Sequence, residues 1–375
     1  MFSLGRFLIS ASLCASGWLA LFNGEVQAQT GAPNKRVTVQ MGGAVQSAIP
    51  TQGKVVTTLA SKARGALLDG PQGITTDGVH LYIVDPINNT VSKLAIATGV
   101  LTRIAGSLTT QAWGYDDGAG SVANFKRPHG ITTDGTNLYI ADSFNHVIRK
   151  MVIATNVVST LSGRWNTAGA IGSEDGAAKD ASFNTPRGIT TDGSYLYVTD
   201  TGNHTIRKIT ISTGAVITFA GTPGVVGHAD GIGAAASFDS LTGITTDGAN
   251  LYVADTKNNT IRKIVIATGA VTTLAGQAGT FGIDDGVGAR ARFTGPHGVV
   301  TDGVNVFVAD AFNNTIRKIV IATGVVTTIA GIPGVNGKVD GLGRSATFSR
   351  PSNLTNDGVY LYVSDTLNSA VRIVE

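Results

Sequence analysis

Cysteine is nearly absent from this chain of 375 residues, and the single one, Cys14, lies close to the N-terminus. It falls within residues 1–28, which have the pattern of a signal peptide: Arg6 gives a positive start, residues 7–22 are an apolar run, and Ala28 ends a small-residue cleavage site. After cleavage no disulfide can form within the chain, and no thiolate remains for metal binding or catalysis. The fold must therefore be held by packing and hydrogen bonds.

Export predicts a secreted or periplasmic protein with no stable membrane insertion after cleavage. One alternative is a retained membrane anchor, although the apolar run is interrupted by serines and a glycine and is shorter than the roughly 20 residues that span a bilayer. A second is a lipoprotein modified at Cys14, where Leu13 stands in place of the small residue expected before it. Residues 29–53 carry Gly, Pro, Gln and Ser without a sustained period, which predicts a flexible leader.

Charge is also scarce, at 14% of residues, and the net charge is only +3. The predicted signal peptide carries one base and one acid, so its removal leaves this value unchanged. The charges are spread through the chain and do not gather into a basic stretch, as a nucleic-acid binding surface requires. We therefore expect no nucleic-acid partner.

The familiar catalytic signatures are missing too. The sequence has no nucleophile elbow, no phosphate-cradling P-loop and no HExxH metalloprotease motif. These absences leave enzyme activity uncertain and favour a binding role.

What the sequence has is one unit repeated six times. The segment ITTDG or a close variant recurs at intervals of 55 to 58 residues, beginning at Ile74, Ile131, Ile189, Ile244, Val299 and Leu354. Each copy continues with short runs rich in Ile, Val, Thr and Tyr, separated by Asp-Gly, Asn-Asn or Thr-Gly pairs that are typical of turns. This pattern predicts four antiparallel strands per copy and no helix.

A single four-stranded sheet cannot bury both faces, so the copies must stack. Twisted sheets that repeat with a fixed rotation close into a ring, and the prediction is an all-β, six-bladed β-propeller over residues 54–375. The sixth copy ends at Glu375 without its fourth strand, whereas residues 54–60, KVVTTLA, form a fourth strand without the other three. We expect this N-terminal strand to complete the last blade and to remove an exposed edge.

The segments DTGNHTIRKI at 200–209 and DSFNHVIRKM at 142–151 resemble the NHL repeat, named for its Asn-His-Leu signature. The resemblance extends from about residue 54 to the end of the chain and implies the six-bladed fold. The remaining copies depart from it at the histidine, with Asn89, Asn259, Asn314 and Ser369 in its place. The signature histidine is therefore not a functional residue shared by all copies.

Other repeated residues are interpreted as structural. An Asp ends the second strand of each copy, and in five copies an Arg follows seven residues later, as in Asp200 and Arg207. These positions face each other in a hairpin, so an ion pair or a bond from Asp to the turn is expected within the blade. The first copy has Ser92 instead of Arg.

The long loops between copies carry Asp-Gly pairs followed by a Phe. The Phe is expected to wedge between blades, with Leu68 as its counterpart in the first copy, and the Asp-Gly pair is interpreted as a turn. Carboxylates beside glycine carbonyls also leave a calcium site open, although adjacent acids such as Asp116 and Asp117 tend to diverge.

Function is expected on the face that carries these long, divergent loops, because variable loops on a rigid scaffold commonly bind ligands. One variable position starts the innermost strand of each copy and should ring the mouth of the central channel: Gln72, His129, Arg187, Thr242, His297 and Ser352. A second lies at the tips of the neighbouring turns and gives a largely apolar patch: Ile87, Phe144, Gly202, Lys257, Phe312 and Leu367.

Two Pro-His motifs, at His129 and His297, bear a resemblance to propeller lyases of the peptidyl-amidoglycolate kind. That resemblance implies zinc at the channel mouth and a metal-dependent lyase or hydrolase. Only these two histidines match, they come from opposite blades, and a site of this type needs about three protein ligands. Arg187 either holds an anionic substrate or is a charge at the rim.

The sequence thus predicts a binding module for a protein or a glycan, with the metal-dependent enzyme as the alternative. RNA binding, known for some NHL domains of eukaryotic regulators, conflicts with export and the weak charge. Zinc and calcium are the cofactors that remain open.

Overall fold

The computed structural model describes residues 54–106, 113–164 and 170–375. The expected signal peptide at 1–28, with Cys14, and the leader at 29–53 lie outside these residues and stay predictions. In the described ranges, no helix has the length and apolar character needed to cross a membrane.

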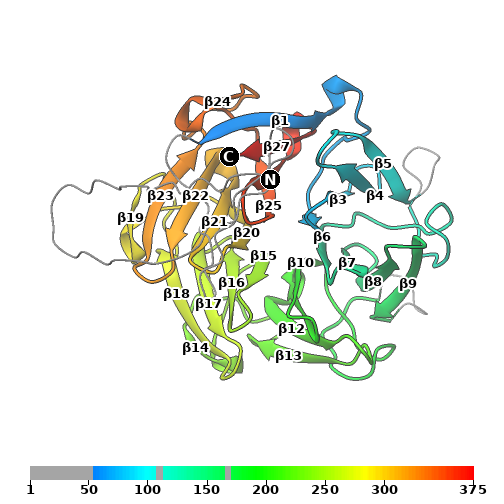
Figure 1. The fold of residues 1–375 in the computed structure, drawn as a ribbon. Helices are drawn as coiled ribbons and strands as arrows, with labels where there is room; N and C mark the ends of the chain where they lie inside the picture. The colour runs from blue at the N-terminus through cyan, green and yellow to red at the C-terminus, as the bar shows by residue number, and fades with distance from the viewer. Residues whose placement is uncertain (1–53, 107–112, 165–169) are drawn as a thin grey trace, which may run out of the picture. The chain divides into compact units, whose positions relative to one another are not determined.

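Six antiparallel sheets follow one another along the chain and form the blades of a ring (Figure 1), which confirms the six-bladed β-propeller. Blades one to three are formed, from the innermost strand outward, by β2 (Ile74–Thr76), β3 (His80–Asp85), β4 (Thr90–Ala95) and β5 (Leu101–Ala105); β6 (Gly130–Thr133), β7 (Asn137–Asp142), β8 (Val147–Val152) and β9 (Val157–Ser162); and β10 (Pro186–Thr191), β11 (Tyr195–Asp200), β12 (Thr205–Thr210) and β13 (Val216–Ala220). Blades four to six contain β15 (Leu241–Thr246), β16 (Asn250–Asp255), β17 (Thr260–Val265) and β18 (Ala270–Gly276); β20 (Pro296–Thr301), β21 (Asn305–Asp310), β22 (Thr315–Val320) and β23 (Val325–Ala330); and β25 (Pro351–Asn356), β26 (Leu361–Asp365), β27 (Ala370–Val374) and β1 (Val55–Ser61).

The ring is closed in blade six by strands from both ends of the described chain. β1 pairs antiparallel with β27, with Val56 opposite Val374 and Thr57 opposite Ile373. In Figure 1 the blue β1 runs beside the red β27. The expected completion of the last blade by the N-terminal strand is therefore confirmed.

Blades four to six contain a fifth strand where the repeat pattern predicts four. These two-residue strands, β14 (Gly231–Ile232), β19 (Gly286–Val287) and β24 (Gly341–Leu342), pair with β18, β23 and β1. Each lies in a long loop that runs along the outer edge of the following blade before entering its innermost strand. The only helices in the described ranges are 3₁₀ turns: η1 (Lys62–Arg64), η2 (Thr201–Asn203), η3 (Gly233–Ala235), η4 (Gly288–Arg290), η5 (Ala311–Asn313), η6 (Gly343–Ser345) and η7 (Thr366–Asn368).

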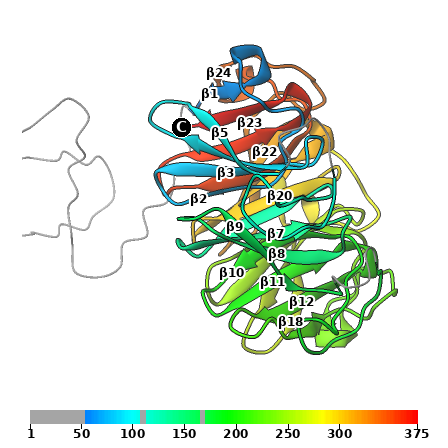
Figure 2. The same cartoon turned by 90° about the vertical axis from the view of Figure 1, so that its right-hand side faces the viewer.

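The strands run between the two faces of the ring, as the view turned by 90° shows (Figure 2). One face carries the short Thr-Asp-Gly turns, which hydrogen bonds make rigid. In blade three, Asp192 Oδ1 accepts from the amides of Ser194 and Tyr195 at 2.9 and 2.7 Å, and its Oδ2 accepts from the Tyr197 hydroxyl at 3.1 Å. The other face, here called the loop face, carries the long loops and the turns between second and third strands.

The hydrophobic core lies between neighbouring blades. Phe125 is fully buried among Val84 and Val91 of blade one and Ile131 and Leu138 of blade two. Phe183, Phe238, Phe293 and Phe348 are equally buried in the corresponding clusters. Leu68 takes this place between blades six and one. The predicted wedge between blades is therefore present around the whole ring.

Candidate functional site

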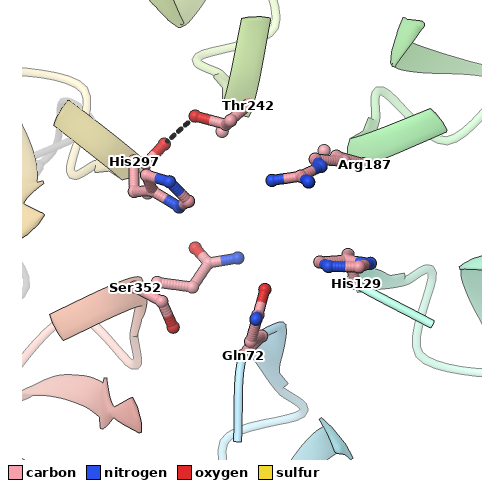
Figure 3. A pocket seen from close by; sticks show the side chains of 10 residues that line it. Gln72, His129, Arg187, Thr242, His297 and Ser352 are labelled. Carbon is pink, nitrogen blue, oxygen red and sulfur yellow. Dashed lines mark hydrogen bonds between the residues drawn. The ribbon is translucent and has the colours of Figure 1, made fainter. Parts of the chain in front are cut away.

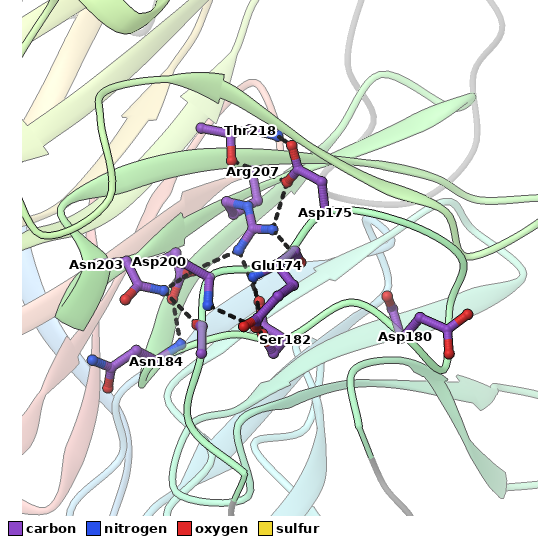
Figure 4. A network of polar contacts seen from close by, with 12 residues as sticks. Glu174, Asp175, Asp180, Ser182, Asn184, Asp200, Asn203, Arg207 and Thr218 are labelled. Atoms are coloured by element: carbon purple, nitrogen blue, oxygen red, sulfur yellow. Dashed lines mark hydrogen bonds and ion pairs between the residues drawn. The ribbon is translucent and has the colours of Figure 1, made fainter.

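The repeated Asp and Arg form a buried hub inside the blade, shown for blade three in Figure 4. Arg207 Nη1 donates to Asp200 Oδ2 and to the Ser182 carbonyl oxygen, both at 2.8 Å. Its Nη2 donates to the Glu174 carbonyl oxygen at 2.9 Å and to Asp175 Oδ1 at 2.7 Å. Burial raises the pKa of Asp200 to about 6, although the positive charge of Arg207 lowers it. This carboxylate is therefore ionised at neutral pH. The predicted ion pair exists, and it serves the fold.

The Asp of each Asp-Gly pair belongs to the same hub, which goes beyond the expected turn. Asp175 also accepts hydrogen bonds from the amide and hydroxyl of Thr218 on the outer strand, at 2.9 and 3.0 Å. The equivalent carboxylates bind the arginines of the other four hubs: Asp117, Asp230, Asp285 and Asp340. Their oxygens already face a guanidinium and a threonine, so this arrangement does not fit a calcium ion. Blade one has Ser92 and no hub arginine, and there Asp85 accepts from nearby backbone amides instead.

The signature position of the repeat joins each blade to the next. His146 Nδ1 accepts the backbone amide of Thr185, and His204 Nδ1 accepts that of Ser240, both at 3.0 Å. Where the signature residue is asparagine, its Oδ1 accepts the same amide of the following loop, as in Asn89, Asn259 and Asn314. All five residues have φ between 56° and 58°, a left-handed conformation in which asparagine and histidine are enriched. Histidine and asparagine are therefore interchangeable here because each offers one acceptor atom.

This bond predicts different effects for two substitutions of His146. We expect His146→Ala to lower the free energy of unfolding by about 1–3 kcal/mol, because it leaves the Thr185 amide without an acceptor. We expect His146→Asn to retain most of the stability, because Asn314 performs the same role in blade five. Urea unfolding of both variants checks this, and equal losses for alanine and asparagine would contradict the assignment.

The six predicted channel residues come together in one hollow at the centre of the loop face. Gln72, His129, Arg187, Thr242, His297 and Ser352 line it with four neighbouring residues, around a volume of about 300 Å³ including its open mouth. Figure 3 shows the six side chains converging from six separate blades. The described lining contains no acidic side chain.

Glycine makes this convergence possible. In five blades the residue after the hollow-lining side chain is a glycine packed against the backbone of the next innermost strand. A Cβ on Gly130 would lie 2.0 Å from the Arg187 carbonyl oxygen, and a Cβ on Gly188 would lie 2.0 Å from that of Thr242. In these five blades the innermost strands approach too closely for a Cβ, which narrows the channel and brings the six side chains within one hollow.

Three of the six side chains are held by hydrogen bonds. Thr242 Oγ1 donates to the His297 carbonyl oxygen at 2.9 Å, and Ser352 Oγ accepts from Thr366 Oγ1 at 2.6 Å. His129 Nδ1 lies 2.8 Å from the Arg127 carbonyl oxygen. A carbonyl oxygen only accepts, so Nδ1 carries the proton and Nε2 retains its lone pair. Among the described residues, the side chains of Gln72, Arg187 and His297 have no hydrogen-bond partner.

The electrostatics of the hollow are dominated by Arg187. Burial, followed by the charge of Arg187, lowers the pKa of the His129 imidazole to about 3. Burial, Arg187 and Arg350 lower the pKa of His297 to about 4. Both imidazoles are therefore uncharged at neutral pH, and the positive charge of the hollow belongs to the guanidinium.

This arrangement does not fit the zinc site that the Pro-His motifs imply. Zinc in a catalytic site takes about three protein ligands, whereas the hollow offers two imidazoles beside a guanidinium that repels a cation. In residues 54–106, 113–164 and 170–375, no three His, Cys, Asp or Glu side chains gather in a group able to hold a metal ion.

A second feature of the loop face is an exposed apolar surface in two rings. The inner ring is formed by the predicted turn tips Ile87, Phe144, Phe312 and Leu367, which are 36–63% exposed. Gly202 and Lys257 hold this position in the other two blades, where Lys257 pairs with Asp239 at 3.8 Å. The outer ring, which the repeated turns do not predict, is formed by Trp113, Ile171, Val226 and Phe281, which are 58–75% exposed.

Hydrogen bonds place the two rings beside each other on the same face. In four blades an asparagine next to the turn tip donates to the carbonyl oxygen of the glycine that follows the outer-ring residue. In blade five, Asn313 Nδ2 donates to the Gly282 oxygen at 2.7 Å, which joins the residue after Phe312 to the residue after Phe281. Blade two has the same bond from Asn145 to Gly114, between Phe144 and Trp113. These eight residues are called the loop-face apolar surface below.

Comparison with known proteins decides the family. No model of a protein family matches the chain. NHL repeat-containing protein 2 of Homo sapiens is 28% identical over 294 residues, which cover 70% of this chain and 40% of that protein. This similarity accompanies a six-bladed ring in which an Asn or His at the signature position joins neighbouring blades in the same way at five of the six junctions. The chain is an NHL-repeat β-propeller.

The other similarities cover a smaller part of the matched protein or show only a shared fold. Protein SUPPRESSOR OF QUENCHING 1, chloroplastic, of Arabidopsis thaliana is 31% identical over 283 residues, which cover 70% of this NHL-repeat propeller and 26% of that protein. The chain spans less than half the length of the curated relatives it matches. An auxiliary nutrient binding protein of Bacteroides thetaiotaomicron has a TM-score of 0.63 at 16% identity, with 86% of this chain and 76% of that chain covered. That likeness shows a shared fold.

Proposed function

We propose that this NHL-repeat propeller is an exported interaction module that binds a protein or a glycan through its loop face. One observation carries the proposal: every exposed aromatic side chain of the described residues lies on that face. These are Trp113, Tyr115, Phe144, Phe281 and Phe312.

Exposure of these aromatic side chains to water is unfavourable in free energy, and a binding partner that covers them removes this cost. Large contiguous apolar patches are rare on soluble monomers and mark interaction sites, and aromatic residues are enriched at interfaces. The opposite face exposes only aliphatic residues at its Thr-Asp-Gly turns, such as Val79 and Val304. The polar network beneath the loop face holds these aromatic groups in place, which lowers the entropy lost on binding.

Two further points support this role. The auxiliary nutrient binding protein has the same fold and is named for binding, which is consistent with a propeller used as a binding scaffold. The signal-peptide pattern of residues 1–28 supports a secreted or periplasmic location, where such a partner is within reach. A metal-dependent lyase or hydrolase is not favoured, because the hollow offers two imidazoles and a repelling cation.

The proposal predicts that two serines in blade five reduce binding. The full chain with Phe281→Ser and Phe312→Ser is expected to lose at least about tenfold in affinity, because aromatic anchors carry most of the binding energy of an interface. The matched control is Val79→Ser with Val304→Ser, which makes the opposite face more polar and is expected to bind like the wild type.

Capture from surface extracts of the source cell, quantified by mass spectrometry, and a glycan array run in parallel provide the measurement. A partner retained by wild type and control and lost by the blade-five variant supports the proposal, and the array tells protein from glycan. Equal retention by all three chains would place binding elsewhere. Intact mass of the exported chain checks cleavage after Ala28, and an uncut chain would refute export by this signal.

A further inference from the structure

Arg187 differs from every other arginine in the described part of the chain. It is partly buried, its Nε atom is inaccessible to solvent, and none of its nitrogens has a hydrogen-bond partner or a counter-ion. The five hub arginines are more deeply buried, but each is paired with two carboxylates. The other arginines without a polar partner, Arg127, Arg290 and Arg350, are exposed.

An unpaired guanidinium in a confined hollow is costly to the folded protein. Removal of a charge from water is unfavourable unless a partner of opposite charge and hydrogen bonds replace the lost hydration. The hub shows that this fold readily supplies an aspartate where it buries an arginine. No acidic side chain lines the hollow, so the missing counter-charge must come from solution.

The surroundings of Arg187 restrict the chemistry of that anion. Two more arginines stand near the hollow, but each lies over an aromatic ring: Arg127 at 5.4 Å from the centre of Phe144 and Arg350 at 4.6 Å from that of Phe312. A single guanidinium therefore faces the hollow, and its planar fork matches one carboxylate in a bidentate pair. A doubly charged phosphate would retain an uncompensated charge.

The uncharged residues of the hollow add a preference for a hydroxyl beside the acid group. His129 Nε2 carries a lone pair, because its Nδ1 proton is donated to the Arg127 carbonyl oxygen. This atom accepts a hydrogen bond and repels a carboxylate oxygen, so it favours a hydroxyl beside the acid group. The Gln72 amide, which has no partner, supplies a further donor for the acid.

From this geometry we propose that the channel mouth is a binding site for a hydroxy-carboxylate, with Arg187 holding the acid group and His129 Nε2 accepting from the hydroxyl. The acid is either a free small molecule or the acidic group of a sugar polymer such as a polyuronate; both present the same chemistry to the hollow. Phe144 and Phe312 of the loop-face apolar surface border this site, but the groups that bind the acid and the hydroxyl belong to other residues. The site is therefore tested separately from the proposed partner binding.

The test follows the ¹³C-labelled histidine resonances of the full chain by NMR and measures affinity by calorimetry. Glycolate and acetate are the probes for a free acid, and trigalacturonate is the probe for a polymer. Acetamide and sodium chloride at equal ionic strength are the controls. We expect glycolate to produce a saturable shift at His129 and His297, acetate to bind more weakly, and both controls to produce none. Preference for trigalacturonate over glycolate identifies the polymer as the source.

Three variants decide the role of the guanidinium. Arg187→Gln is expected to lower glycolate affinity about 10- to 100-fold, the contribution of a charge-assisted bond. Arg187→Lys, which keeps the charge without the fork, is expected to retain part of it, and Arg290→Gln at an exposed site should bind as wild type.

Unchanged affinity in a folded Arg187→Gln chain, or tighter binding of inorganic phosphate than of glycolate, would overturn the proposal. A shift with glycolate no larger than that with chloride would do the same. The Phe281→Ser and Phe312→Ser chain, in which Arg350 loses its aromatic ring, is expected to bind glycolate at least as tightly as the wild type. If this chain retains its protein or glycan partner and the wild type binds glycolate as expected, the proposed function fails and the hydroxy-carboxylate site stands.

Discussion

Replacement of Arg207 by alanine is expected to lower the free energy of unfolding by about 3–5 kcal/mol. The substitution leaves Asp200 ionised and fully buried without its counter-charge, and it removes the donors to the Ser182 and Glu174 carbonyl oxygens. It also releases Asp175, so the loop that passes along the outer edge of blade three loses its anchor. Urea unfolding followed by circular dichroism provides the measurement.

Arg290→Ala is the matched control, because Arg290 is exposed and makes no ion pair in the described residues. Its effect is expected to stay within about 0.5 kcal/mol. A loss below about 1 kcal/mol for Arg207→Ala would mean that the hub contributes little net stability and that the aspartate is readily hydrated or neutralised.

Truncation of a wedge phenylalanine is expected to have an effect of similar size for a different reason. Phe238→Ala opens a cavity between blades three and four, where the phenyl group packs among Ile206, Leu241 and Ile244. It should lower the free energy of unfolding by about 3–5 kcal/mol. The same experiment on Phe281, which is 75% exposed, provides the control. A small effect at Phe238 would show that neighbouring blades move together to refill the space, and a large effect at Phe281 would show that its ring supports the loop.

Much of the fold follows from the sequence because it depends on local pattern. Alternating apolar residues and turn pairs predict each strand. The sixth copy has no fourth strand after Ala370–Val374, and the orphan strand at Val55–Ser61 therefore predicts how the ring closes. The ion pair of Asp200 with Arg207 is also predictable from their spacing, although the two residues are not directly opposite. Asp200 lies opposite Thr205 and Arg207 opposite Val198, so the two side chains meet diagonally on one face of the hairpin.

What could not be predicted depends on contacts between distant segments. The fifth strands form where a loop passes the edge of the next blade, and two residues of pairing leave no pattern in the sequence. The hub carboxylate Asp175 lies 32 residues from Arg207, and its role could have been found only from the constant spacing of this pair in five copies. The outer ring at Trp113 and Phe281 was missed because each residue lies in a loop whose length varies between copies.

For the candidate site, too, the positions of the residues follow from the sequence, whereas their contacts do not. Alignment of the copies identifies the six residues that line the hollow, because each precedes the position that is glycine in five of the six copies. It does not show which of them are engaged. That Thr242 and Ser352 are bonded to their neighbours while Arg187 is unpaired depends on side-chain positions that the repeat pattern does not contain.

The pairing of β1 with β27 also determines when the propeller can close. Val56 and Val374 pair across almost the full length of the propeller sequence, so blade six cannot assemble until the last residues are available. During synthesis the ring therefore stays open, with unsatisfied strand edges on both sides of the gap. A chain lacking β27 would keep that gap. Closure of the ring thus depends on the simultaneous presence of the first and the last strand of the propeller.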